Sequence, residues 1–492
     1  MSSREARGFL AAICSNPEDD TARLVFADWL DEQGNAPRAE FIRAQVKRAA
    51  LPEWDARRVR LLMRERVLLA AHEAEWRAEL PAIRGATWGP FRRGFVAEAI
   101  FNTFMAFKVS GPECWAAAPV EAAAVGWPRQ RDVAAVPTLR ELTVVGNLVA
   151  PDDLSRLIDS PVLSTLRTLT VRDAALGPEG VRRLITSPHL RNLTTLRVPH
   201  NAIGNTAIYA IVANTTLPNL TELDLSEPDS YGRYAEDPII NAAGAGALAK
   251  WPGLARVRAL ALSGNNLEQP GLRALLHSPH ATGLKHLALR GNALTGAAMK
   301  EFRDAPAGLQ LESLDLGENV LGHVGAGHLA RAECLRELKV LHVDRCELGA
   351  AAARKLAKAE FFGGLRVLNI GYSNLGRNGL AALLEASPAE LHTLGAAGSD
   401  LGDAGAAELA KSPASNALLD IDLTWNRLGD KALRSLAASG HLQNLLALKL
   451  DDNDEIGKQA ATDFAKSALG KRLAVLELPR MPPWGPNDPI PF

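Results

Sequence analysis

The chain has 492 residues, of which 47% are hydrophobic and 23% charged, and its 55 basic residues balance 56 acidic ones. This balance excludes a uniformly basic nucleic-acid-binding protein and a highly charged disordered chain, and it leaves room for local charged patches. At about 150 residues per domain the length predicts about three compact domains, unless the chain is built from repeats.

The N-terminal residues and the cysteines bear on the cellular compartment. Residues 1–20 hold one short apolar stretch interrupted by charges, which is unlike a signal peptide. No window of about 18 uninterrupted apolar residues occurs, so we expect no transmembrane helix. The cysteines form no CxxC pair, which argues against a disulfide scaffold and a zinc site: Cys14, Cys114, Cys334 and Cys346. We therefore expect a cytoplasmic protein without membrane attachment.

Residues 1–50 are predicted to form a small all-α domain of three short helices. The stretch FLAAI marks the first helix, Thr21 can cap the second, and Pro37 begins the third. The core DDTARLVFADWLDEQGNAPRAEFIRAQ resembles the bacterial repeat-companion domain, a family found at the N-terminus of repeat-rich bacterial proteins. This resemblance implies a bacterial source and supplies no biochemical activity.

Charges are segregated in this region, with acids concentrated in residues 4–32 and bases in residues 38–66. We interpret the segregation as ion pairing within the domain, with these candidate partners: Asp28, Glu40, Arg23, Arg38 and Arg43. The alternative is a patch for nucleic acid or an acidic partner, because Arg57, Arg60 and Arg64 share one helical face. Neighbouring acids dilute that field, so nucleic-acid binding is not expected.

Residues 51–118 are expected to form a helical linker and an N-terminal cap. A long helix or helix pair is predicted over residues 53–85, and GPFRRGFVAEAIF at residues 89–101 is predicted to be a strand that starts the following array. Six of the nine tryptophans precede residue 128. Large aromatic side chains there suit helices that cover the otherwise open end of a stack.

Residues 119–480 are predicted to be a repeat array. The template L-x-x-L-x-L-x-x-N-x-L recurs about thirteen times at a spacing of about 27 residues, after a degenerate first unit. The copies start at Leu139, Leu166, Leu193, Leu220, Val257, Leu284, Leu311, Leu338, Leu365, Leu391, Leu418, Leu445 and Leu473. Each unit alternates apolar residues as in a strand and then shows helical spacing, so stacked units share one core.

These units resemble leucine-rich repeats of the ribonuclease-inhibitor-like class. The resemblance implies an α/β solenoid, a horseshoe with a parallel sheet on its concave face and helices outside, that grips a macromolecular partner on the concave face. Asparagine at template position 9 is expected to satisfy backbone groups in the turn after the strand, and Cys346 is interpreted as a buried substitute there. The regularly placed cysteines of the namesake inhibitor are missing, so ribonuclease is not the expected target.

Two segments depart from the repeat. The fourth unit has ten extra residues around EPDSYGRYAEDP, where a loop would overhang the concave rim, and we expect Tyr231, Arg233 and Tyr234 to contact a partner. The alternative is a tolerated surface insertion. Residues 481–492 are rich in proline and are expected to form a C-terminal cap, because proline cannot donate to strand pairing.

Template positions 3, 5 and 7 should face the concave side, with position 8 at its rim. Early copies are basic there, middle copies are small and neutral, and later copies are acidic with two aromatics. The predicted partner-binding residues are Arg172, Arg197, His342, Asp344, Tyr372, Asp420, Asp422, Trp425, Asp451 and Glu477. A solvated sheet without a ligand is the alternative.

Catalytic and metal-binding patterns are missing from the sequence, which has no HExxH, GxxxxGK[ST] or GxSxG motif and no zinc-ligand spacing. We therefore expect no cofactor, no metal and no enzymatic activity. The sequence predicts a non-enzymatic, monomeric protein that binds a protein partner. A regulatory or sensor subunit of a bacterial defence or signalling complex is one alternative. An enzyme that uses acids of the N-terminal domain, such as Asp28 and Glu40, is another.

Overall fold

The computed structural model describes residues 4–126, 136–146, 151–228, 239–386 and 388–479. The chain divides into two compact units, the first made of Met1–Pro52 with Arg64–Asn292 and the second of Glu53–Met63 with Ala293–Phe492. No helix within the described ranges is long and apolar enough to cross a membrane. The expected C-terminal cap at residues 481–492 lies outside the described residues.

Four helices precede the first strand: α1 (Arg4–Ser15), α2 (Asp20–Glu32), α3 (Ala36–Ala49) and α4 (Ala56–Ala78). The prediction that Thr21 caps the second helix is wrong. Asp19 is the N-cap residue, and its carboxylate accepts a hydrogen bond from the backbone N–H of Thr21 at 2.9 Å. Asn35 caps α3 in the same way by accepting from the N–H of Arg38. Both caps use a short side chain that reaches the free amides of the first turn.

Ion pairs link the N-terminal helices, in part as the sequence predicts. Arg43 pairs with Asp28 and Asp31, both at 2.6 Å. The other predicted carboxylate, Glu40, pairs with Arg64 of α4 at 2.6 Å. The prediction that Arg38 forms an ion pair is wrong, because none of the described carboxylates pairs with it and its side chain is buried among aromatic rings.

The sheet of the first unit begins with β1 (Ala86–Trp88), which pairs antiparallel with β4 (Glu98–Phe101), while β2 (Phe91–Arg92) and β3 (Phe95–Val96) form a separate hairpin. From β4 onward all pairs are parallel. These strands are β5 (Ala122–Val125), β6 (Glu141–Val145), β7 (Thr168–Arg172), β8 (Thr195–Arg197), β9 (Glu222–Asp224), β10 (Ala259–Ala261) and β11 (His286–Ala288).

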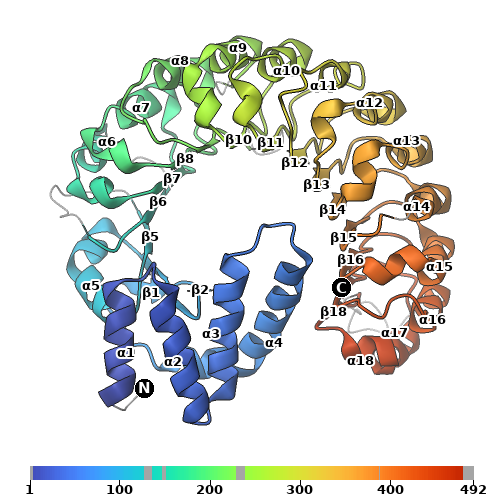
Figure 1. Ribbon diagram of the computed structural model, residues 1–492, viewed down its shortest axis with the longest axis horizontal. Coiled ribbons are helices and arrows are strands. Elements are labelled where there is room, and N and C mark those ends of the chain that lie inside the picture. Colours follow the sequence, from blue (N-terminus) through green and yellow to red (C-terminus); the bar gives the residue numbers. More distant parts are fainter. Residues whose placement is uncertain (1–3, 127–135, 147–150, 229–238, 387, 480–492) are drawn as a thin grey trace, which may run out of the picture. The chain divides into compact units, whose positions relative to one another are not determined.

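Helices alternate with these strands and lie on one side of them (Figure 1). They are α5 (Phe104–Ala117), α6 (Pro151–Ile158), α7 (Gly177–Leu184), α8 (Gly204–Ala213), α9 (Ala242–Lys250) and α10 (Glu268–Leu276). Short 3-10 helices often lead into the next strand: η1 (Pro161–Thr165), η2 (Pro188–Asn192), η3 (Pro252–Arg256) and η4 (Ala281–Gly283). Proline at the start of three of these turns stops the preceding helix.

The second unit repeats the same pattern. Its parallel strands are β12 (Ser313–Asp315), β13 (Val340–His342), β14 (Val367–Asn369), β15 (Thr393–Gly395), β16 (Asp420–Asp422), β17 (Ala447–Lys449) and β18 (Val475–Glu477). Its helices are α11 (Lys300–Arg303), α12 (Gly322–Leu329), α13 (Gly349–Leu356), α14 (Gly376–Glu385), α15 (Gly402–Lys411), α16 (Asp430–Ala437), α17 (Lys458–Lys466) and α18 (Ala468–Arg472), with the 3-10 helices η5 (Glu333–Leu335), η6 (Glu360–Gly364) and η7 (Pro413–Ala417).

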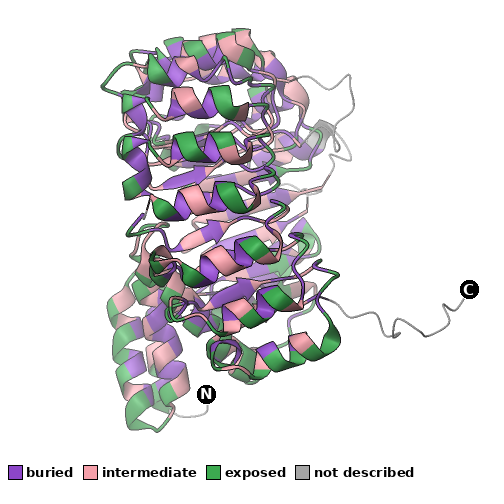
Figure 2. Ribbon diagram, turned by 90° about the vertical axis from the view of Figure 1, so that its right-hand side faces the viewer, coloured by how far each residue is buried: buried purple, intermediate pink, exposed green. Residues whose placement is uncertain are grey.

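The core of the second unit lies between its strands and its helices. The middle residue of each strand from β12 to β17 is buried, as Leu368 and Ile421 illustrate, while its neighbours on either side point to the opposite face. Figure 2 shows the matching feature of the helices, which carry a buried stripe beside an exposed one. The α/β solenoid predicted from the repeat is therefore confirmed.

Asparagines at template position 9 connect consecutive repeats. The Oδ1 atom of Asn426 accepts from the amides of Ser399 and Leu401 in the preceding repeat, and its Nδ2 donates to the carbonyls of Ala396 and Thr424. Asn201, Asn265, Asn292 and Asn453 follow the same pattern. The prediction that this asparagine satisfies backbone groups in the turn after the strand is confirmed. Each side-chain amide forms hydrogen bonds with backbone groups of two consecutive repeats.

Cys346 occupies the same position and is fully buried, with its thiol donating to the carbonyl of Leu316 at 3.1 Å. The interpretation of this cysteine as a buried substitute for asparagine is confirmed.

Candidate functional site

The strand face opposite the helices carries a hollow in the second unit, which we call the strand groove. Its volume is about 370 Å³. The polar or charged residues that line it are His342, Asp344, Asn369, Tyr372, Thr393, Asp420, Asp422, Thr424 and Lys449. Five of them are predicted site residues, namely His342, Asp344, Tyr372, Asp420 and Asp422. Four of these come together because side chains at template positions 3, 5 and 7 leave the sheet on the same side, and Tyr372 reaches the groove from position 8.

Acidic side chains dominate the strand groove. Asp344 is 7% exposed, and its carboxylate accepts a hydrogen bond from the amide of Asn369 at 3.0 Å. The carboxylate of Asp422 lies 3.8 Å from Nζ of Lys449. With Asp420 the groove holds three carboxylates against one lysine, so its local field attracts cations.

A second hollow of about 450 Å³, which we call the rim hollow, adjoins the strand groove because Tyr372 lines both. Trp425, which lies two repeats after Tyr372, also lines the rim hollow and is 59% exposed. Its indole N–H donates to the carboxylate of Asp452. The guanidinium carbon of Arg345 lies 3.9 Å from the centre of the Tyr372 ring. Four carboxylates also line this hollow: Asp400, Asp452, Asp454 and Glu455.

The two rim aromatics are held in an unusual backbone conformation. Tyr372 has φ of 53° and Trp425 has φ of 58°, both in the left-handed region. Both stand at template position 8, which is left-handed in repeats with glycine there, such as Gly264 and Gly398 with φ of 70° and 59°, and also in repeats with a polar side chain, such as Asp173 and His200. A residue with a side chain costs about 1–2 kcal/mol more than glycine in this conformation. The rings of Tyr372 and Trp425 are exposed instead of packed in the core, and this exposure calls for another role.

The residues Glu53–Met63 belong to the second unit and contact the start of β15. Nε2 of His392 donates to the backbone carbonyl of Trp54 at 2.9 Å, and Nδ1 of His392 lies 3.0 Å from the hydroxyl of Thr393, a residue of the strand groove. Burial lowers the pKa of His392 below its usual value. Hydrogen bonds from Arg57, with a smaller contribution from nearby Arg366, lower the pKa of Asp55 to about 2.

Sequence reasoning missed this contact. His392 and Arg366 occupy template position 2, for which the repeat pattern predicts neither the concave face nor the core. Trp54 precedes His392 by 338 residues, so their contact cannot be inferred from neighbouring positions in the sequence. The sequence signal is weak: His392 stands where about half of the other repeats have arginine or lysine, as at Arg258 and Lys285.

The remaining predicted site residues lie elsewhere. Arg172 and Arg197 belong to the first unit, where they pair with Asp173 at 3.2 Å and with Glu222 at 3.0 Å. Asp451 is partly buried on the second unit and lines neither hollow. Glu477 is exposed on β18. The loop residues lie outside the described part of the chain: Tyr231, Arg233 and Tyr234.

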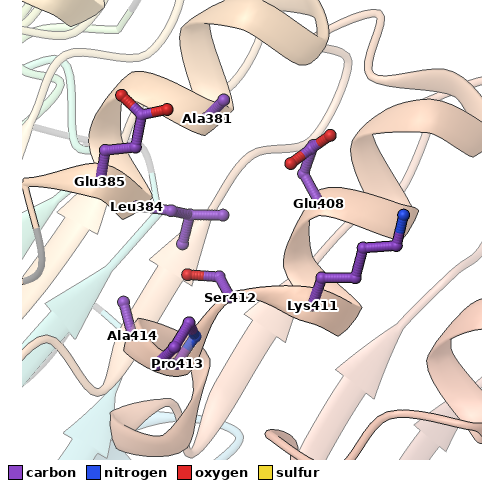
Figure 3. A pocket seen from close by; sticks show the side chains of 8 residues that line it. All are labelled: Ala381, Leu384, Glu385, Glu408, Lys411, Ser412, Pro413 and Ala414. Atoms are coloured by element: carbon purple, nitrogen blue, oxygen red, sulfur yellow. The ribbon is translucent and has the colours of Figure 1, made fainter.

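A third hollow, of about 320 Å³, lies on the helix side of the second unit between α14 and α15. Figure 3 shows Glu385 and Glu408 on these neighbouring helices, with Ser412 and Pro413 beside them. Glu408 already accepts a hydrogen bond from Arg377 at 2.8 Å, and none of the lining residues is aromatic. This hollow has no anchor residue of the kind that the rim hollow provides.

The cysteines offer no activated nucleophile among the described residues. Burial raises the pKa of Cys14 and Cys114 to about 11 and that of Cys334 to about 12. Thiols with a raised pKa stay protonated at neutral pH and react slowly. Within the described ranges no group of three His, Cys, Asp or Glu side chains could hold a metal ion.

Comparison with known proteins identifies the repeat. Residues 189–212 and 414–437 match the family model described as Leucine Rich repeat. Both matches fall on a 3-10 turn, strand and helix of the array, so these two units are similar to leucine-rich repeats. No curated protein matches the sequence.

Two solved structures illustrate how distant the structural relatives are. An internalin from Listeria monocytogenes is 16% identical with a TM-score of 0.35, and the match covers 67% of this chain and 86% of that one. A structure of the Rad7 and Elc1 complex in yeast is 14% identical with a TM-score of 0.42, and the match covers 97% of this chain and 98% of that one. Similarity at this level carries no conclusion about a partner.

Proposed function

We propose that this leucine-rich-repeat protein binds a protein partner through the strand groove and the rim hollow of its second unit. The observation that carries the proposal is Trp425, a large ring that is 59% exposed at a rim position where other repeats have glycine or mostly polar side chains. Exposed aromatic side chains in a pocket are favoured anchors of protein interfaces. Tyr372 supplies a second ring in the same hollow.

The charges of this site define the kind of partner. Asp344, Asp420 and Asp422 line the groove, and four more carboxylates line the rim hollow. A protein segment that presents lysine or arginine beside an apolar side chain complements the carboxylates and the aromatic rings of this site. Nucleic acid does not, since its phosphates would be repelled by the same carboxylates. Binding to this surface should weaken as salt concentration rises.

Site-specific photo-cross-linking in the native host tests the proposal. A benzophenone amino acid placed at position 425 of the full-length protein should capture a discrete protein. The matched control places the same residue at Val324, which is 47% exposed on α12. Equal capture from both positions, or none from position 425, would contradict binding at this site.

A regulatory or sensor subunit of a bacterial defence or signalling complex is the second candidate. It is favoured by the contact of Trp54 with His392, because residues from the region before the repeats then adjoin the proposed binding surface. Neighbouring genes for a nuclease, protease or kinase would support this candidate. Loss of complex formation on His392→Ala, with the fold retained, would support it directly, and an unchanged complex would count against it.

The remaining organisation is part of the same proposal. We assign residues 1–50 to a repeat-companion-like domain, 51–118 to a linker and cap, 119–480 to the repeats and 481–492 to a C-terminal cap. A monomeric, non-enzymatic protein in a bacterial cytoplasm is the setting that we propose for it. Size-exclusion chromatography with light scattering tests the monomer.

A further inference from the structure

The first unit contains a buried cation that forms no ion pair with any of its described residues. Arg38 extends from α3 and is 4% exposed. Its guanidinium carbon lies 4.6 Å from the ring centre of Trp76, 5.3 Å from that of Phe91, and 5.6 Å from those of Phe41 and Phe95. Aromatic faces attract a cation but accept no conventional hydrogen bond from its N–H groups, so the rings leave the donors of Arg38 unused.

Two of the three guanidinium nitrogens, Nε and Nη1, are buried without a hydrogen-bond partner among the described residues. Burial lowers the pKa of Arg38 to about 10, and the charges of Glu79 and Glu75 only partly oppose this effect. Arg38 therefore remains charged at neutral pH. Removing such a charge from water is unfavourable unless an anion compensates for it.

Arg23 shows how the same unit normally treats a buried arginine. It is also fully buried, and its Nε and Nη2 atoms likewise lack hydrogen-bond partners among the described residues, but its guanidinium lies 3.6 Å from Glu121 and 4.0 Å from Asp20, two carboxylates that also pair with Arg93. Arg38 has no such pair among the described residues, and it borders a cavity.

The cavity beside Arg38 has a volume of about 110 Å³. Its walls are mainly apolar and come from Ala6, Leu10, Trp76, Leu80, Phe91 and Val96. The charged residues that line it are Arg38, Arg7 and Glu79, which leaves one positive charge in excess. An apolar cavity of roughly 150 Å³ accepts benzene in another protein, so this one suits a body of a few carbon atoms.

We propose that this cavity binds a small organic monocarboxylate, with the carboxylate at Arg38 and a short apolar body against the hydrophobic walls. A carboxylate supplies acceptors for the buried N–H donors and neutralises the excess charge. Inorganic phosphate would also meet the cation, but it would leave the apolar walls unfilled and carry its own charge into them. The site is distinct from the strand groove and rim hollow, which belong to the second unit.

Calorimetric titration of the full-length protein with hexanoate tests the proposal. We expect saturable binding with a dissociation constant on the order of 1 mM, in keeping with the few atoms that such a ligand buries. Hexylamine has the same body with the opposite charge and should not bind. Inorganic phosphate should bind at least about tenfold more weakly than hexanoate, because phosphate has no apolar body to contact the walls of the cavity.

Two variants localise the binding. Arg38→Met should weaken hexanoate binding at least about tenfold, because the charge-assisted hydrogen bonds are lost. Ala118→Leu places extra atoms in the cavity wall, where Ala118 is 2% exposed, and should block binding while Arg38 is retained. Arg43→Met is the matched control, since it removes one positive charge from α3 at an exposed position outside the cavity.

Each outcome decides the question. Hexanoate binding that is lost in Arg38→Met and Ala118→Leu but kept in Arg43→Met supports the site. If Arg38→Met does not fold, the result with Ala118→Leu decides alone. Absence of saturable hexanoate binding, or binding that survives in both cavity variants, overturns the proposal.

Discussion

Replacing Asn426 by alanine tests whether the position 9 asparagine holds two repeats together. The amide is fully buried and makes four hydrogen bonds, to the N–H groups of Ser399 and Leu401 and to the carbonyls of Ala396 and Thr424. Alanine makes none of these bonds and leaves three backbone groups without the partner shown here, since the carbonyl of Thr424 still accepts from the N–H of Gly398 at 2.8 Å.

The expected loss of stability follows from those three groups. A buried polar group left without a partner costs about 1–3 kcal/mol, and water entering the space left by the amide reduces the upper end of that range. We therefore expect Asn426→Ala to lower the free energy of unfolding by about 3–5 kcal/mol. This value approaches the largest effects that single substitutions produce.

Urea unfolding followed by circular dichroism measures the change, and hydrogen exchange at Ser399 and Leu401 localises it. Asn444→Ala is the matched control, because Asn444 donates one hydrogen bond to the carbonyl of Asn416 at 2.8 Å but is exposed. The control should lose less than about 1 kcal/mol. A loss below about 1 kcal/mol for Asn426→Ala, or unchanged exchange at the two amides, would refute the reasoning.

Three further predictions concern other parts of the chain. Trp425→Gly should leave the free energy of unfolding unchanged or raise it by up to about 1 kcal/mol. Glycine removes the cost of the left-handed backbone in the folded state, and this gain offsets the larger conformational entropy of glycine in the unfolded chain. A loss of more than about 1 kcal/mol in urea unfolding would contradict this prediction. The folded pKa of His392 is lowered, so its contribution to stability is fully present above about pH 6.5 and is lost as pH falls through the lowered value. The urea concentration at the midpoint of unfolding should therefore change less between pH 7.5 and pH 5.5 in His392→Gln than in the parent protein. The thiols of Cys114 and Cys334 should react with a disulfide reagent only upon unfolding, because burial raises their pKa to about 11 and about 12; rapid reaction of both in native buffer would contradict their burial.

The fold could be predicted from the sequence because each repeat specifies itself locally. Leu368 and Ile421 lie in the core at the positions that the alternation assigns to them, and Asn426 lies where the template places it. The grouping of His342, Asp344, Asp420 and Asp422 on one face follows from the same alternation and the parallel register.

What the sequence did not predict depends on contacts between distant segments. The position of Arg38 suggested an ion pair, because nothing in its neighbourhood along the chain indicates that Phe91 and Phe95 fold over it. His392 could not be linked to Trp54 for the same reason. Thr21 and Asp19 are both good caps, and only the geometry of the first turn decides between them.

Template position 8 makes the rim of this protein open to evolutionary change. Its backbone adopts the left-handed conformation whether it carries Asp173, His200, Arg345, Tyr372 or Trp425. Since these side chains leave the core untouched, one of them can replace another without repacking the repeat. The backbone conformation costs each of them no more than about 1–2 kcal/mol, less for Asp and His than for the large rings, so an exchange changes folding only modestly. A lineage could thus change its binding partner one rim residue at a time, and related chains with the same core could recognise unrelated proteins.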